Sequence, residues 1–251
     1  MELTQYYMEK NPCYTQAKPM KPRGIVVHDT SAGNPYISRY VGPDDGIIGP
    51  NRYGNDWNKP TANKCVHAFI GLDKNDTVRT YNVLPWDFKC WGCGGGSKGS
   101  YNNTHIQFEI CDDKYKSQDY FERIWTESTE LCAYLLKMFN LTPDTIVSHK
   151  EAHQQGFASD HSDTSVWFSK FGKTMNDFRG AVARLMDEKK PVVINPTYLL
   201  YGPGSRARKL AYLDEGTEVE LTGTERNGYK RAVVTVTYAG YIKDNDLGVR
   251  S

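Results

Sequence analysis

The chain has 251 residues, of which 39% are hydrophobic, and its 31 basic side chains nearly balance its 30 acidic ones. This balance excludes a molecule-wide field that would draw the protein to nucleic acid or anionic lipid. The length allows one sizeable core and predicts two domains. No stretch reaches the roughly 20 apolar residues of a membrane span, so no membrane insertion is expected. The chain does not begin with a basic segment and an apolar run, so we expect synthesis in the cytoplasm without a signal peptide.

The first predicted strand follows a polar, proline-containing segment, residues 1–22, which we interpret as an irregular lead-in. Residues 24–30 read G-I-V-V-H-D-T, a short β-branched run bounded by turn formers, which is typical of a buried strand. His28 stands near its carboxyl end, where ligands bind in open α/β sheets. Residues 34–41 are predicted to form a short helix, with an asparagine cap followed by proline.

The next strands are predicted to form a hairpin. Residues 65–71 alternate as a strand does, and the turn D-K-N-D leads into a second strand at residues 78–83. His67 lies on the apolar face of the first strand, so we interpret it as a satisfied core residue. Residues 105–111 form a further strand with isoleucine and phenylalanine on one face and Glu109 on the other. A carboxylate in the middle of a strand needs water or a partner, which makes Glu109 a candidate functional residue.

Two amphipathic helices are predicted at residues 119–140 and 174–186, where apolar side chains follow helical spacing. The sequence D-E-K-K-P at residues 187–191 then ends the helical pattern, and only strand and turn signals come after it. A domain boundary near residue 190 follows. The strand signals beyond it lie at residues 198–201, 217–221, 229–238 and 241–242.

Between the two helices, residues 146–168 hold three of the six histidines and two aspartates. The first histidine follows an apolar pair, so its imidazole lies at the mouth of a short buried strand. The second lies four positions later, on the same face of a helix. This is not the H-E-x-x-H motif, because lysine follows the first histidine. The candidate ligands for a borderline-soft ion such as zinc are His149, His153, His161 and Asp163.

All six cysteines lie before residue 133, and we expect them to be reduced thiols. Cys90 and Cys93 form a C-x-x-C motif. A redox role would place this motif at the start of a helix, but a glycine-rich run follows it. A structural zinc would need two more ligands, which Cys65 and Cys111 could supply only if the fold brings them together.

The order of these features resembles the zinc-dependent N-acetylmuramoyl-L-alanine amidases of the peptidoglycan-recognition-protein and phage-lysozyme type. The matching motifs are I-V-V-H-D-T, C-V-H-A-F-I, C-W-G-C-G, H-I-Q-F-E-I-C and I-V-S-H-K, which together span roughly residues 23–186. The resemblance implies an α/β catalytic domain over residues 1–187, with a mixed central sheet flanked by helices. The order S-H-K-E-A-H, A-S-D-H-S-D and W-F is similar to the amidase domain of endolysins from phages of Gram-positive hosts.

The resemblance also implies zinc as the cofactor and a role for each site residue. His28, His149 and Asp163 match the three zinc ligands of the family. Glu109 matches a glutamate that is catalytic in some members and would move a proton from water to the leaving amine. His161 stands two positions before the third ligand, where relatives carry Lys or Thr, and would donate a hydrogen bond to the oxyanion.

One alternative for the second ligand stays open. The 14 positions from His149 to Asp163 exceed the family's usual spacing of about eight to ten, whereas His153 lies 10 positions before Asp163. The residue after Asp163 also differs, since Thr164 stands where relatives often have proline.

The implied substrate is the amide between the lactyl group of N-acetylmuramic acid and L-alanine in the peptidoglycan of a Gram-positive wall. The protein would reach this wall after release in phage or prophage lysis. Two other classes remain: a catalytically weak peptidoglycan-binding protein, and a zinc peptidase acting within the stem peptide or a muramidase. The sequence leaves the host and the oligomeric state open.

Residues 195–251 resemble bacterial SH3-like domains, through the motifs Y-G-P-G-S-R-A-R, L-D-E-G-T-E-V-E-L and Y-A-G-Y-I. The resemblance implies a small all-β barrel that binds cell wall, joined to the catalytic domain by a linker at residues 188–194. Four tyrosines are either core residues or sugar-stacking residues, with a core position favoured for most of them: Tyr201, Tyr212, Tyr229 and Tyr241.

Overall fold

The computed structural model of the protein describes residues 1, 3–42, 48–187, 192–222 and 226–234. The chain divides into two compact units, Met1–Asp187 and Glu188–Ser251. In the part of the chain that the structure describes, no helix is both long and apolar enough to cross a membrane.

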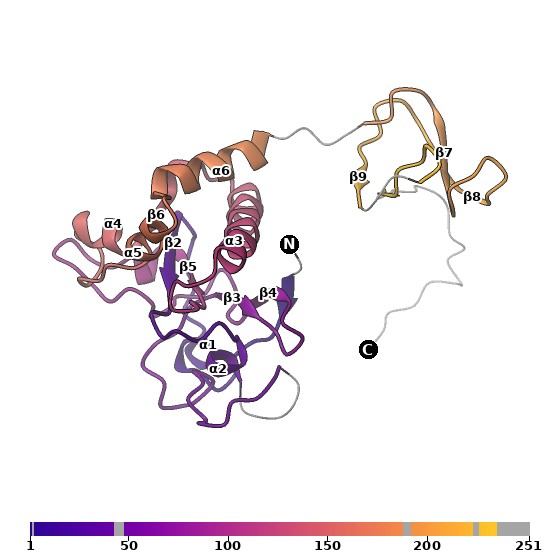
Figure 1. Ribbon diagram of the computed structural model, residues 1–251. Coiled ribbons are helices and arrows are strands. Elements are labelled where there is room, and N and C mark those ends of the chain that lie inside the picture. Colours follow the sequence, from indigo (N-terminus) through magenta and orange to yellow (C-terminus); the bar gives the residue numbers. More distant parts are fainter. Residues whose placement is uncertain (2, 43–47, 188–191, 223–225, 235–251) are drawn as a thin grey trace, which may run out of the picture. The chain divides into compact units, whose positions relative to one another are not determined.

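The first unit is built on a six-stranded mixed sheet with the strand order β1-β4-β3-β5-β2-β6 (Figure 1). Every neighbouring pair is parallel except β3 and β4, which form the antiparallel hairpin that the sequence predicts. The strands are β1 (Leu3–Gln5), β2 (Gly24–Asp29), β3 (Ala68–Leu72), β4 (Val78–Asn82), β5 (His105–Ile110) and β6 (Ile146–Ser148).

Two long helices, α3 and α6, pack together and cover one face of the sheet (Figure 1). Val27 of β2 and Phe108 of β5 belong to the core on this face. Because strand side chains alternate between the two faces, His28 and Glu109 point to the opposite face. The helices of the unit are α1 (Pro12–Gln16), α2 (Ser38–Val41), α3 (Gln118–Phe139), α4 (His149–Gln154), α5 (Ser165–Lys170) and α6 (Met175–Asp187), with 3-10 turns at Tyr101–Asn103 and Pro143–Thr145.

The amphipathic helix expected at residues 119–140 is confirmed as α3, and its ends follow from its capping residues. The Ser117 side chain accepts a hydrogen bond from the Tyr120 N–H at the start of the helix. Asn140 adopts the left-handed conformation at its end, where the Asn140 N–H donates to the Leu136 carbonyl.

Two expectations for the first unit are wrong. Residues 1–22 are not irregular throughout, because β1 extends the sheet by pairing with β4, and α1 follows. The helix expected at residues 34–41 begins only at Ser38. The preceding backbone is paired with the end of β3: the Leu72 N–H donates to the Pro35 carbonyl at 2.7 Å, and the Ile37 N–H donates to the Leu72 carbonyl at 3.0 Å.

The second unit is described only in part. Its described strands form two antiparallel pairs, β7 (Thr197–Leu200) with β8 (Lys209–Leu213), and β9 (Glu220–Leu221) with β10 (Ala232–Val233). The β character expected from the sequence is present, whereas a closed barrel is not shown by these strands. The strand predicted at residues 241–242, which includes Tyr241, lies outside the described residues.

Candidate metal centre

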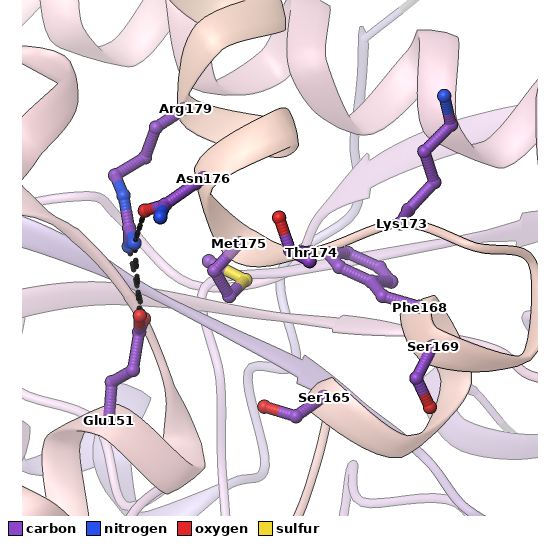
Figure 2. A pocket seen from close by; sticks show the side chains of 9 residues that line it. All are labelled: Glu151, Ser165, Phe168, Ser169, Lys173, Thr174, Met175, Asn176 and Arg179. Carbon is purple, nitrogen blue, oxygen red and sulfur yellow. Dashed lines mark hydrogen bonds and ion pairs between the residues drawn. The ribbon is translucent and has the colours of Figure 1, made fainter.

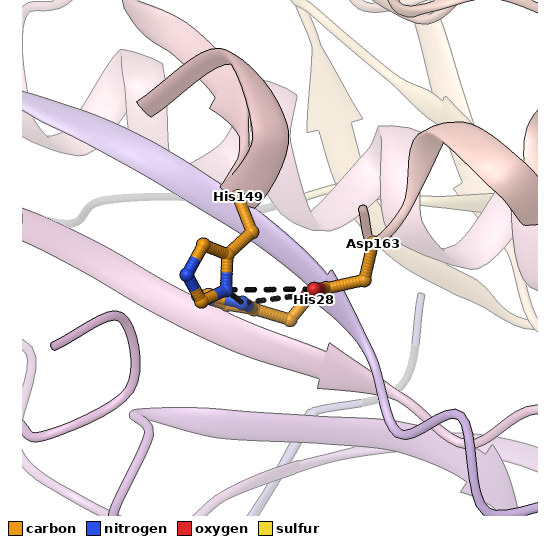
Figure 3. A group of neighbouring side chains, drawn as sticks. All are labelled: His28, His149 and Asp163. Carbon is orange, nitrogen blue, oxygen red and sulfur yellow. Dashed lines mark hydrogen bonds and ion pairs between the residues drawn. The ribbon is translucent and has the colours of Figure 1, made fainter. Parts of the chain in front are cut away.

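Three side chains from distant parts of the sequence meet at the carboxyl ends of β2 and β6 (Figure 3). His28 lies in β2, His149 is the first residue of α4, and Asp163 lies in the loop before α5. His28 Nδ1 is 3.0 Å from Asp163 Oδ2 and 3.1 Å from His149 Nδ1. His149 Nδ1 is 3.5 Å from Asp163 Oδ1. One ligand atom of each residue lies within 4.8 Å of the other two, and no other such group was found among the described residues.

The chemistry of this group fits a divalent cation. Two ring nitrogens 3.1 Å apart that face a carboxylate need either a shared proton or a cation between them. Burial opposes the charge on Asp163, but the hydrogen bonds and charges of His149 and His28 outweigh it and hold the Asp163 pKa below its usual range. Burial also opposes the charge on His28, yet its hydrogen bond to Asp163 raises the His28 pKa. The donor set suits a borderline-soft ion.

His149 is held in place by the capping of α4. The Ser148 hydroxyl accepts from the Glu151 N–H at 3.1 Å, and the Glu151 carboxylate accepts from the Ser148 N–H at 2.9 Å. Arg179 of α6 donates to both oxygens of the same carboxylate, at 3.0 and 3.1 Å, and to the Ile146 carbonyl. This ion pair lies in a small pocket of about 250 Å³ (Figure 2). The long helix α6 therefore supports the short helix that presents the second imidazole.

Glu109 lies beside the three converging residues. It is in register with His28 across the β2–β5 pair, and both side chains line a cleft of about 460 Å³. Glu109 Oε2 is buried and has no hydrogen-bond partner. Burial raises the pKa of Glu109 to about 8; His28 lowers it, and the Asp163 carboxylate raises it. A cation held by the neighbouring ligands would favour the ionised form.

The other predicted histidines lie in different surroundings. The exposed His161 ring stacks on His149 with 4.7 Å between ring centroids, and its Nδ1 is 4.0 Å from Asp163 Oδ1. The structure does not bring His153 into the group: its side chain is 43% exposed, and its Nδ1 donates to the Ala158 carbonyl at 3.1 Å. His67 is a satisfied core residue, as expected. Its Nε2 donates to the Phe88 carbonyl, and burial lowers the His67 pKa to about 4.

The six cysteines are buried free thiols. Burial raises the pKa of Cys65, Cys90 and Cys111 well above the usual thiol range. None of them belongs to the one group of described residues that could hold a metal ion. The structure therefore does not support a second, cysteine-ligated site.

Sequence reasoning missed the polar partners of the two imidazoles. His28 Nε2 lies 2.9 Å from Gln107 Oε1, and His149 Nε2 lies 3.4 Å from Ser159 Oγ. Gln107 could have been found, because strand alternation places it on the same face of β5 as Glu109. The sequence gives no signal for Ser159, whose position depends on the path of the loop.

Two imidazoles and one carboxylate that line a cleft at the carboxyl edge of a largely parallel sheet are a donor set of the kind that catalytic zinc sites use. The comparison with known families agrees. The family model described as N-acetylmuramoyl-L-alanine amidase matches residues 18–165. This match covers more than half of the chain, so the chain belongs to the N-acetylmuramoyl-L-alanine amidase family and is a peptidoglycan hydrolase.

Several solved structures are similar. The Staphylococcus aureus hydrolase AmiA, in complex with its ligand, is 21% identical, with 74% of this chain and 83% of that chain covered and a TM-score of 0.57. The catalytic domain of XlyA is 20% identical, with 72% and 99% covered and a TM-score of 0.49. A mutant endolysin from Bacillus subtilis is 19% identical, with 72% and 99% covered and a TM-score of 0.48. The likeness to AmiA shows a shared fold. No curated protein sequence matches the chain.

Proposed function

We propose that this amidase cleaves the bond between the lactyl group of N-acetylmuramic acid and L-alanine, with zinc held by His28, His149 and Asp163. The observation that supports the proposal is the convergence of their ligand atoms within 4.8 Å in the lining of the cleft. Two neutral imidazoles and one carboxylate suit zinc better than magnesium or calcium. When bound, zinc would activate a water molecule and polarise the scissile carbonyl.

Glu109 would carry the proton in this reaction. Its Oε2 has no partner within the protein, so it is free to accept the proton of the attacking water. The same carboxyl then donates that proton to the leaving amine nitrogen. Burial raises the Glu109 pKa to about 8, and a bound cation would lower it, which favours the ionised form that can accept a proton and then donate it.

His161 would stabilise the negative charge that develops on the substrate oxygen. Its exposed ring lies over His149 at the edge of the cleft, and a ring N–H there can donate to the oxyanion. The oxyanion role needs a donor only, so a neutral imidazole suffices.

Mass spectrometry of digested Gram-positive wall tests the proposed reaction. An amidase releases intact peptides that begin with L-alanine. A peptidase acting within the stem leaves alanine attached to the glycan, a muramidase releases glycan fragments that still carry peptide, and a binding protein releases nothing. The first pattern is expected from the parent, and the Asp163→Ala variant, prepared in the same way, is expected to release no peptide. Any of the other patterns from the parent would refute the assignment.

We also propose that residues 195–251 form an SH3-like domain that binds the wall, joined by a linker at residues 188–194. The sequence motifs support this. The sequence favours a core position for most of the four tyrosines, but Tyr201 (74% exposed), Tyr212 (52% exposed) and Tyr229 (37% exposed) are exposed, which leaves them available to stack on sugars. Tethering the amidase to an insoluble polymer would raise its local concentration. A fluorescent reporter fused to residues 188–251 should decorate Gram-positive cells. The absence of decoration on every wall tested would remove this role.

The resemblance of the S-H-K-E-A-H stretch to phage proteins supports a further proposal, that the chain acts as an endolysin in phage or prophage lysis. Induced inside a Gram-positive host, the protein should leave the turbidity of the culture unchanged until the membrane is permeabilised, and should then clear it. Clearing without permeabilisation would contradict action after release.

A further inference from the structure

We propose that Gln107 is a positioning residue that fixes the imidazole of His28 with its Nδ1 lone pair facing the metal centre. This inference rests on the proposed role of His28 as a ligand. Gln107 lies in β5, two residues before Glu109 and on the same face, and its side chain is fully buried. Gln107 Oε1 lies 2.9 Å from His28 Nε2, on the side of the ring that faces away from Asp163.

The orientation of the Gln107 amide is set by donors that cannot be reversed. The backbone N–H groups of Gly92 and Cys93 lie 3.1 and 3.0 Å from Asn102 Oδ1. A backbone N–H only donates, so the oxygen of the Asn102 amide must occupy this position. Gln107 Nε2 lies 2.9 Å from the same oxygen and must therefore be the amide nitrogen. This leaves Gln107 Oε1 facing His28.

The tautomer of His28 follows from this arrangement. Because Gln107 Oε1 is an acceptor, His28 Nε2 must carry a hydrogen and donate it. A neutral imidazole then has its lone pair on Nδ1, which is the atom nearest to Asp163 Oδ2 and His149 Nδ1. A hydrogen bond at one ring nitrogen fixes which nitrogen can bind a metal and how the ring is oriented. Gln107 therefore selects Nδ1 as the ligand atom of His28.

This chain of hydrogen bonds gives the C-W-G-C-G motif a role in orienting the Gln107 amide. The Cys93 thiol takes part in it, since Cys93 Sγ lies 3.2 Å from Asn102 Oδ1 and 3.5 Å from Gln107 Nε2. The motif supplies the two backbone N–H groups that hold Asn102. Its central glycine also makes room for the amide, because a Cβ atom on Gly92 would lie 2.4 Å from Gln107 Oε1. Any side chain at position 92 would push the end of Gln107 away from His28.

Two variants disturb the Gln107 amide from opposite sides. Gln107→Ala removes it, and Gly92→Ala displaces it while leaving it in the chain. Loss of such a supporting partner typically weakens metal binding by about 10- to 100-fold, and we expect each variant to lower zinc affinity within this range. The double variant should bind zinc no more weakly than Gln107→Ala, since it contains no amide to displace. Asn82→Ala is the matched control, because it truncates a buried amide that donates to the His67 and Leu84 carbonyls rather than to a residue of the metal centre. Its zinc affinity should stay within about threefold of the parent.

Zinc affinity is measured by competition with a chelator, and the tautomer by ¹⁵N spectra of histidine-labelled, zinc-loaded protein. The chain has six histidines, so the His28 signals can be assigned by comparison with His28→Ala. We expect the parent to carry hydrogen on His28 Nε2 and none on Nδ1.

A hydrogen on His28 Nδ1 would overturn the inference. Zinc affinities of Gln107→Ala and Gly92→Ala that both lie within about threefold of the parent would also overturn it. If His28→Ala keeps the parent's zinc affinity, the proposed ligand role fails as well. Lost affinity in His28→Ala with unchanged affinity in Gln107→Ala overturns only the role of Gln107.

Discussion

Replacing Glu109 by glutamine separates proton transfer from metal binding. The two side chains have the same shape, and Glu109 Oε2 has no hydrogen-bond partner that the change could break. Glu109 also lies outside the group of His28, His149 and Asp163, so Glu109→Gln should keep its zinc. An amide cannot accept the proton of water, and general acid–base catalysis is typically worth about 10²- to 10⁴-fold. Since each factor of ten corresponds to about 1.4 kcal/mol, the reaction barrier should rise by about 3 to 5 kcal/mol.

The assay for Glu109→Gln is the rate at which peptides beginning with L-alanine are released from purified wall, with zinc content measured on the same samples. Glu127→Gln is the matched control, because Glu127 is a partly buried carboxylate on α3 that bonds Thr80 away from the cleft. The control should keep the parent's rate. If Glu109→Gln retains zinc and releases peptide at the parent's rate, Glu109 is not the group that moves the proton.

Three further predictions follow from the site and its surroundings. Asp163→Ala should lose zinc and activity together, whereas His153→Ala should keep both; zinc loss in His153→Ala would restore the alternative ligand. His161→Ala should keep zinc and lose about 10²- to 10³-fold in turnover, as expected for the loss of one oxyanion donor. His161→Lys should keep substantial activity. Turnover of His161→Ala within about threefold of the parent would contradict this role. Burial lowers the pKa of His67 and His105 to about 4. Between about pH 6.5 and pH 4 these two histidines therefore bind protons in the unfolded chain but not in the folded protein. The free energy of unfolding should decrease as the pH falls through this range. The free energy of unfolding measured with urea should be about 2 kcal/mol per histidine lower at pH 5 than at pH 7.5. Replacing either histidine by phenylalanine should make this decrease smaller.

Much of the fold follows from local patterns. The β-branched runs around residues 24–30 and 105–111 and the helical spacing of α3 and α6 identify their elements, because side-chain period is a local property. Two predictions made from local sequence are wrong, because backbone from distant parts of the chain forms hydrogen bonds with these residues. The N-terminal segment carries no alternation that marks β1, which exists because β4 offers it an edge, and the end of β3 holds residues 35–37 out of the helix predicted there.

For the site, the sequence by itself determined the residue types, the strand ends that carry them, and the face of β5 that presents Glu109. Only the tertiary structure decided which of the clustered histidines meet. His149 and His153 lie one helical turn apart with equal chemistry, yet only His149, at the first position of α4, points at His28. The path of the loop from residue 155 to Asp163 closes this group and brings Ser159 to its edge. The periodicity of a strand or helix determines the face on which each side chain lies. Which side chains from distant segments come into contact depends on how the strands and helices pack across the whole sheet, and a local sequence pattern does not contain that information.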